Sequence, residues 1–308
     1  MKMTKVCATA LLTLTASVSL SACIDREAVT PTKENSAIST PEKIVKEKPI
    51  PSPNLGISSV SSALYDIKKS KPLYEENPQV VTPIASVTKL MTTYLVLQAI
   101  HDKKLSWDEK LSLEPLDDKA AISLYMTTSK KAWTVKDLYA AMIVMSANDA
   151  AEALGKRLSD DFPAKMNKTA KSMGLSNRSN FVSASGLDKD GKENVSISKD
   201  LFLLASELIT KFPEVLDMTS KASYVTSNDY TLKSTDALLA NKEIDGLDGL
   251  KTGFTDGAGY CFVGTAEQNG KRLISIVLKA QTTDARFQDT KKLMAYGFAN
   301  QHKTSYEK

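Results

Sequence analysis

The chain has 308 residues, of which 42% are hydrophobic and 25% charged, with 40 basic and 36 acidic side chains. A chain of this length and apolar content can build one large domain or two modest ones around a substantial core. The net charge of +4 is small, and a nucleic-acid-binding protein usually shows a concentrated basic face instead. The composition therefore gives no indication of a nucleic-acid partner.

The first residues predict export. MKMTK is a short cationic start, and the apolar run VCATALLTLTASVSL is too short and too rich in Ser and Thr for a stable transmembrane helix. The run ends at Leu20-Ser21-Ala22-Cys23, which resembles a bacterial lipobox, where the cysteine is lipidated and becomes the first mature residue. An ordinary signal peptide with an incidental cysteine is the alternative. We predict a lipoprotein signal over residues 1–22 and lipidation at Cys23.

Such a protein would be anchored on the outer face of the cytoplasmic membrane, or lie in the periplasm or at the outer membrane. Cysteine usage agrees with export without a disulfide. Cys7 leaves with the signal and Cys23 would carry lipid, so Cys261 has no partner. The fold should then be stabilised by its core.

Residues 23–54 predict a disordered tether behind the lipidated cysteine. From residue 24 onward the segment has five prolines, five acids and five bases, and no aromatic residue. It cannot bury enough apolar surface to fold. A coil of this length spans roughly 30 Å, which suits an enzyme working near the membrane but not in it.

The catalytic domain is predicted over residues 55–308. Its first folded segment, 57–78, has two strand-like runs around KKSK and indicates a hairpin. Helical periodicity follows from 87 to about 212, with Thr134 as an N-cap and Gly174 as a stop. Strands return over 249–280, and a last helix closes the chain. The pattern predicts one α/β domain in which both chain ends build a sheet around a mostly helical insertion.

The first candidate motif is Ser-x-x-Lys. It occurs three times, at Ser86/Lys89, Ser196/Lys199 and Ser305/Lys308. Only Ser86 lies at a turn that leads into a long apolar helix. There, free backbone N–H groups and the helix dipole would stabilise an oxyanion at the serine. Burial would lower the pKa of Lys89 and make a neutral amine accessible as a base. A lysine reaching back to solvent is the alternative.

The second motif is Ser146-Ala147-Asn148, which interrupts the apolar run LYAAMIVM. Buried polar side chains need hydrogen-bond partners. The structural interpretation is a helix end with the serine as cap. The functional interpretation is a second hydroxyl that relays protons toward a leaving nitrogen, with Asn148 positioning Lys89 and a substrate amide.

The third motif is Lys251-Thr252-Gly253, the only K-T-G in the chain. On a strand, Lys251 and Gly253 face one way and Thr252 the other. A glycine at 253 leaves room for the backbone of a ligand along the strand. An edge-strand glycine beside a solvated lysine is the alternative. The order and separation of the three motifs make coincidence remote.

Nothing in the sequence indicates a metal or a cofactor. His101 and His302 lie in ordinary polar contexts, and neither they nor Cys261 belongs to a metal-ligand cluster. The phosphate-binding pattern G-x-x-x-x-G-K-[ST] does not occur. We therefore expect no metal and no cofactor.

The segments ASVTKLMT, MSANDAAEAL, DGLKTGFTDGAGYCFVGTAE and KKLMAYGF resemble the D-alanyl-D-alanine carboxypeptidases among the low-molecular-mass penicillin-binding proteins. The resemblance covers about residues 57 to 299. It implies the penicillin-recognising serine-enzyme fold, an antiparallel sheet with helices on both sides plus a helical subdomain. It also implies removal of the terminal D-Ala from peptidoglycan stem peptides, with β-lactam antibiotics as acylating inhibitors.

The resemblance also implies roles for individual residues. Ser86 would be the nucleophile, Lys89 its base, and Ser146 and Asn148 the second side of the cleft. Lys251, Thr252 and Gly253 would hold the carboxylate and the backbone of the substrate. The N–H groups of Ser86 and Phe254 would form the oxyanion hole. Arg286 would assist in binding the terminal carboxylate.

Two departures and three alternatives remain. Many relatives carry a second, β-rich domain and a C-terminal amphipathic anchor, which lipid at Cys23 would replace. The loop FVSASGLDKD has Ser185 where many relatives have His, which leaves the role of the Ser185–Asp188 loop open.

An endopeptidase acting on D-Ala cross-links would use the same acyl-enzyme. A class A β-lactamase would need a Glu-x-x-x-Asn loop, which does not occur between the second and third motifs. A penicillin-binding sensor that acylates and signals would require a transmembrane helix or a cytoplasmic partner domain.

Overall fold

The computed structural model describes residues 53–69, 71–118, 120–128 and 132–299. The predicted signal, Cys23 and nearly all of the tether lie outside the described residues. Two short helical turns are η1 (Ala85–Thr88, 3-10) and η2 (Ala141–Met145, π). The strands are β1 (Ser61–Asp66), β2 (Pro72–Glu76), β3 (Thr82–Pro83), β4 (Lys110–Ser112), β5 (Ala132–Thr134), β6 (Val195–Ser196), β7 (Ser223–Val225), β8 (Thr231–Lys233), β9 (Leu247–Thr255), β10 (Gly259–Gln268) and β11 (Lys271–Ala280). The α-helices are α1 (Lys89–His101), α2 (Leu124–Thr127), α3 (Val135–Ala140), α4 (Asn148–Leu158), α5 (Phe162–Ser172), α6 (Ser198–Lys211), α7 (Val215–Thr219), α8 (Ala237–Ala240) and α9 (Thr283–Ala299).

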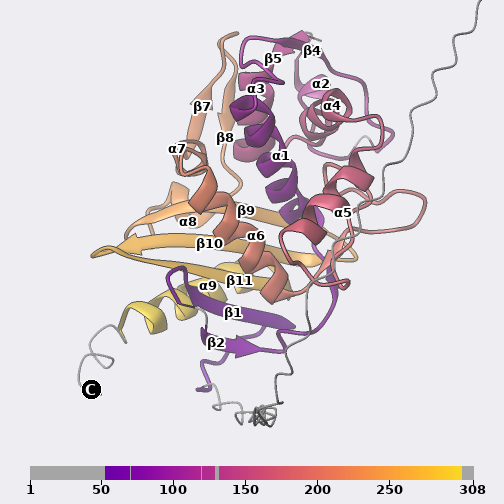
Figure 1. Ribbon diagram of the computed structural model, residues 1–308. Coiled ribbons are helices and arrows are strands. Elements are labelled where there is room, and N and C mark those ends of the chain that lie inside the picture. Colours follow the sequence, from indigo (N-terminus) through magenta and orange to yellow (C-terminus); the bar gives the residue numbers. More distant parts are fainter. Residues whose placement is uncertain (1–52, 70, 119, 129–131, 300–308) are drawn as a thin grey trace, which may run out of the picture. The chain divides into compact units, whose positions relative to one another are not determined.

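Both ends of the described chain build one antiparallel sheet of five strands in the order β2-β1-β11-β10-β9 (Figure 1). The expected hairpin is β1 with β2, and β1 also pairs with β11, so that Ser61 lies opposite Leu278. The strands β9, β10 and β11 follow one another through tight turns, as the sequence predicts. The edge strand β9 carries the K-T-G motif.

The two faces of the sheet pack against different helices, because side chains alternate along each strand. Leu64 and Val277 belong to a small core with Leu293 and Met294 of α9. The opposite face, which includes Ala63 and the other alternate positions, belongs to the large core shared with the helical part of the chain. The sheet is therefore covered on both sides, which confirms the predicted fold class.

The helical part lies between β3 and β9 in the chain. Helix α1 is buried on nearly all sides, as its continuous apolar sequence requires. Thr134 caps α3 by accepting a hydrogen bond from the Asp137 N–H, as predicted. The small sheets β4/β5 and β7/β8 were not expected from the sequence. Within the described residues, no helix has both the length and the apolar character that crossing a membrane requires.

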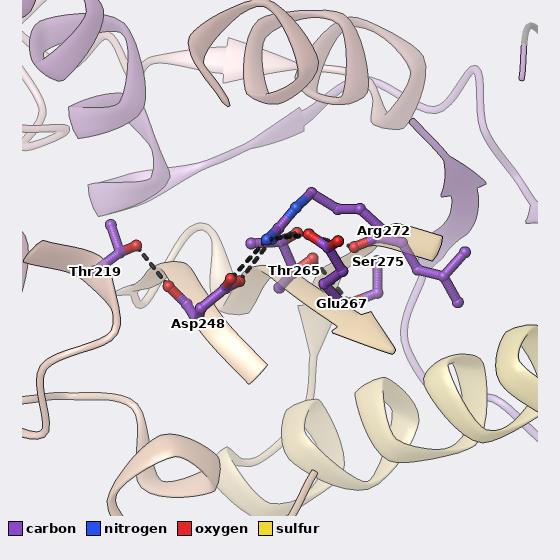
Figure 2. A network of polar contacts seen from close by, with 8 residues as sticks. Thr219, Asp248, Thr265, Glu267, Arg272 and Ser275 are labelled. Carbon is purple, nitrogen blue, oxygen red and sulfur yellow. Dashed lines mark hydrogen bonds and ion pairs between the residues drawn. The ribbon is translucent and has the colours of Figure 1, made fainter. Parts of the chain in front are cut away.

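A partly buried ion-pair network joins three strands of the sheet (Figure 2). Arg272 of β11 donates to both carboxylate oxygens of Asp248 on β9, each at 2.8 Å, and to Glu267 on β10 at 2.8 Å. Thr219, the last residue of α7, donates to the Asp248 carbonyl oxygen at 2.6 Å. The network fixes the start of β9, just before its K-T-G motif begins at Lys251.

Candidate active site

Ser86 sits in the turn η1, where the backbone is held tightly from two sides. Ala85, the residue before it, has a positive φ of 44°, a strained conformation that often occurs at functional sites. On one side lies Gly253 of β9, where an added Cβ would stand 2.8 Å from the Ile84 carbonyl oxygen. On the other lies Gly186, where a Cβ would stand 2.0 Å from the Ala85 carbonyl oxygen. The turn that carries Ser86 is thus in close contact with the backbones of Gly253 and Gly186.

Lys89 begins α1, one turn after Ser86, and its side chain is fully buried. Its Nζ donates to the Ser86 Oγ at 2.8 Å, to the Asn148 Oδ1 at 2.7 Å and to the Ser185 carbonyl oxygen at 2.6 Å. Three acceptors use all the donors of an ammonium group. The structure therefore places Lys89 in contact with the candidate nucleophile and with Asn148 of the second motif.

Burial holds the pKa of Lys89 well below its usual value, because a charged amine is poorly solvated there. The positive charge of Lys251 lowers this pKa further, whereas the carboxylates of Glu152 and Asp149 raise it. A neutral Lys89 can accept a proton, which a charged ammonium cannot. Such an environment suits a general base.

Ser146 connects the second and third motifs. It follows η2 with a left-handed φ of 66°, so the helix breaks here and α4 starts two residues later at Asn148. Its hydroxyl accepts a hydrogen bond from the Lys251 Nζ at 2.9 Å. Burial, together with the charge of Arg286, lowers the pKa of Lys251 to about 7. Ser146 is therefore linked to a lysine that can change its charge near neutral pH.

Arg286 of α9 and Thr252 of β9 lie at the same end of the cleft. The Arg286 Nη1 donates to the Gly253 carbonyl oxygen at 3.2 Å, and its Nε is buried without a hydrogen-bond partner. The Thr252 hydroxyl lies 2.5 Å from that of Thr235. Burial lowers the pKa of Arg286 to about 10, so it stays a cation at neutral pH.

One cleft of about 1200 Å³ contains the candidate residues. The site residues that line it are Ser86, Ser146, Asn148, Thr252, Gly253 and Arg286. Phe254 also lines it, and its side chain is 48% exposed. Loop residues 116–118 and 120–122 form part of one rim, and residues 186–190 part of another. Lys89 and Lys251 lie buried beneath this surface.

Three side chains near the site could not be singled out from the sequence. Glu152 lines the cleft and lies one helical turn after Asn148, a spacing that already puts both on one face of α4. Thr235 and Asp236 come from the loop before α8, and only the fold brings them to β9. Burial raises the pKa of the Asp236 carboxyl to about 6.

The other candidate residues take no part in this cluster. Ser196 is buried on β6 with its hydroxyl 2.8 Å from that of Ser179, and Lys199 is exposed. Cys261 is a free, buried cysteine, and His101 contacts Glu214 at 2.6 Å. No group of His, Cys, Asp and Glu that could hold a metal ion occurs in the part of the chain that the structure describes. His302 and the Ser305/Lys308 pair lie outside that part.

Comparison with known proteins agrees with this arrangement. Residues 46–282 match the model of the D-alanyl-D-alanine carboxypeptidase family Peptidase_S11, and the chain belongs to this family. It is 30% identical over 249 residues to the D-alanyl-D-alanine carboxypeptidase DacF of Bacillus subtilis, covering 78% of this chain and 62% of that protein. It is 29% identical to a D-alanyl-D-alanine endopeptidase of Escherichia coli, covering 78% of this chain and 77% of that protein.

The similarity extends to solved structures. Penicillin-binding protein D2 of Listeria monocytogenes, in its ampicillin-bound form, is 57% identical, with a TM-score of 0.77, covering 80% of this chain and 99% of that one. The chain spans about three fifths of the length of the carboxypeptidases it first matches, 62% in the case of DacF. These findings show the low-molecular-mass penicillin-binding protein family and its fold, as the sequence motifs predicted.

Proposed function

We propose that the chain is a serine D-alanyl-D-alanine carboxypeptidase that removes the terminal D-Ala of peptidoglycan stem peptides through an acyl-enzyme at Ser86. The observation that carries the proposal is the contact of 2.8 Å between the buried Lys89 Nζ and the Ser86 Oγ. Family membership supports the same reaction.

In the acylation step, neutral Lys89 takes the Ser86 proton while the Ser86 Oγ attacks the carbonyl carbon of the penultimate D-Ala. The N–H groups of Ser86 and Phe254 receive the developing oxyanion. The C–N bond then breaks, and the leaving amine of the terminal D-Ala takes a proton from the Ser146 hydroxyl, which recovers one from Lys251. Water then attacks the ester carbonyl, and the Ser86 oxygen leaves with the proton that Lys89 held. The proton released from the water and the new carboxylic acid restores Lys251.

The part of the cleft lined by Thr252 and Arg286 would bind the free carboxylate of the substrate. Thr252 offers a hydroxyl there, and Arg286 is a buried cation with an unpaired Nε. A guanidinium matches the planar geometry of a carboxylate. This arrangement favours substrates that end in a carboxylate, and β-lactams carry a carboxylate beside the ring.

The test measures two reactions with one preparation. Intact-protein mass spectrometry after benzylpenicillin should show one adduct, mapped to Ser86 and lasting minutes or longer, and the preparation should release D-Ala from a pentapeptide mimic. A penicilloyl ester should persist because its leaving nitrogen stays tethered in the opened ring and hinders water. Rapid penicillin turnover without D-Ala release would instead indicate a β-lactamase.

Two variants complete the test. Ser86→Ala should abolish labelling, and Lys89→Ala should slow acylation by roughly 10²- to 10⁴-fold, the usual worth of general-base catalysis. Labelling that survives in Ser86→Ala would refute the nucleophile assignment.

An endopeptidase acting on cross-linked stem peptides is a second candidate, supported by the similarity to the Escherichia coli endopeptidase. It would use the same Ser86 ester and differ in the amine that leaves. Cleavage of a cross-linked muropeptide dimer, measured beside D-Ala release from the pentapeptide, decides between the two activities.

A further inference from the structure

Glu152 is a carboxylate next to the candidate base that the proposed reaction does not use. It lies on α4, four residues after Asn148, so both side chains point from the same helix face. Asn148 contacts Lys89 directly, whereas Glu152 lines the cleft and is half-buried. Its Oε1 accepts a hydrogen bond from the Ser185 N–H at 3.0 Å.

The bond to Ser185 matters because the same residue holds Lys89. The Ser185 carbonyl oxygen accepts from the Lys89 Nζ at 2.6 Å, and the preceding carbonyl, of Ala184, accepts from the Thr92 hydroxyl at 2.7 Å. Two successive peptide groups therefore fit between α1 and α4. Glu152 binds these peptide groups from α4, and Lys89 and Thr92 bind them from α1.

The loop residues on either side of Ser185, Ser183 and Gly186, are held by other contacts that do not involve Glu152. The Asn194 side chain accepts from the Ser183 N–H at 3.1 Å and donates to the Thr88 hydroxyl at 2.9 Å. Gly186 packs on the Ala85 carbonyl. Glu152 thus restrains the loop at Ser185, the residue whose carbonyl oxygen contacts Lys89.

We propose that Glu152 is a positioning residue for Lys89, which orients the Ser185 carbonyl toward the amine and places a negative charge beside it. The inference rests on the proposed function, in which Lys89 is the base for Ser86. It also gives the Ser185 position a role that does not need a histidine side chain, since the contacts to Lys89 and Glu152 are made by the backbone.

The charged groups that act on Lys89 predict the direction of the effect. From α4 these are Glu152 and Asp149, and from β9 it is Lys251. The Asp149 carboxylate is occupied by the N–H groups of Leu124 and Tyr125. The negative charge of Glu152 favours protonated Lys89, so its removal lowers the pKa of Lys89 and makes the neutral base available at lower pH.

The experiment is the pH profile of the second-order rate of benzylpenicillin acylation. Glu152→Gln keeps an acceptor for the Ser185 N–H but removes the charge, so the acidic limb should move to lower pH while the plateau stays within roughly tenfold of the wild type. Glu152→Asp keeps the charge and should retain the position of the limb. Glu152→Ala should move the limb and also lower the plateau by roughly tenfold or more, because the loop loses its restraint.

The control is Glu207→Gln, an exposed carboxylate on α6, which should leave the profile unchanged. An acidic limb in Glu152→Gln that superimposes on the wild type would overturn the inference. So would an equal loss of plateau in all three variants with an unmoved limb, which would mean structural support alone. Failure of the proposed function is distinguishable, because it would appear as labelling of Ser86→Ala.

Discussion

Three basic side chains, those of Lys89, Lys251 and Arg286, are buried within one small site. Loss of water lowers the pKa values of all three, and repulsion from a neighbouring cation lowers those of the two lysines further. Such an arrangement weakens the folded state and is typical of functional sites. In the proposed reaction the three basic side chains have separate roles, since Lys89 accepts a proton, Lys251 contacts Ser146, and Arg286 faces the substrate carboxylate.

Arg286→Ala should weaken turnover of peptides that end in free D-Ala-D-Ala. Loss of one charge-assisted hydrogen bond costs about 1.5–3 kcal/mol, so kcat/KM should fall by roughly tenfold or more. The same peptide with a C-terminal amide is the control, and it should lose much less because it carries no carboxylate. Equal losses on both peptides would show that Arg286 acts only through its bonds to the backbone, to the carbonyl oxygens of Gly253 on β9 and Cys261 on β10.

Among the elements, the edge strand β9 must keep its position relative to the turn that carries Ser86. It carries the K-T-G motif, packs against the turn that carries Ser86 and is joined at its start to Arg272 through Asp248 (Figure 2). The Arg272 side chain is 12% exposed and that of Asp248 21%. Removing one member of a partly buried pair leaves the other charge without its partner, which costs more than loss of a surface pair.

Arg272→Met should therefore lower the free energy of unfolding by about 2–4 kcal/mol, measured by urea denaturation. The matched control is Arg157→Met, which breaks the more exposed ion pair with Glu109 and should cost less than about 1 kcal/mol. If both variants lose the same small amount, the network does not fasten the sheet.

The sequence predicted those features that depend on neighbours along the chain. The strands β9, β10 and β11, the cap at Thr134 and the turn-to-helix position of Ser86 all follow from local sequence, namely glycine-containing turns, a capping residue and a turn before an apolar run. Lys89 could be paired with Ser86 because the two lie three positions apart, one helical turn. Contacts across the fold could not be predicted in this way, since Glu152 reaches Ser185 across 33 positions and Thr235 reaches Thr252 across 17.

Short elements were also missed, for a physical reason. Strands β4, β5, β7 and β8 have three residues each, too few for an alternation to be recognised. The π-helical turn before Ser146 keeps the apolar pattern of an ordinary helix. Its break appears only in the left-handed conformation of the serine.

At the scale of the whole molecule, we propose that the catalytic domain works at a membrane surface through lipid on Cys23. The motif Leu20-Ser21-Ala22-Cys23 and the proline-rich segment 24–54 support this proposal. A tether would let the cleft reach peptidoglycan while the enzyme stays attached. Two acyl chains on one cysteine would provide stable anchoring, whereas a single chain binds only weakly.

Cys23→Ser should release the protein from membranes and leave activity on soluble peptides unchanged, because the substitution lies far along the chain from every cleft residue. The measurement is fractionation of cells followed by penicillin labelling of the soluble and membrane fractions. A variant that stays with the membranes would contradict lipidation as the anchor.

The two glycines beside the turn that carries Ser86 also restrict how the proposed enzyme could escape an inhibitor. A methyl group at Gly186 or Gly253 would collide with the backbone next to Ser86, so selection has almost no substitutions to choose from there. In the proposed enzyme, mutations that discriminate a drug from the natural peptide should therefore occur at exposed residues at the edge of the cleft, such as Ile122. Resistance would therefore arise by reshaping the entrance of the cleft, with the reacting serine left as it is.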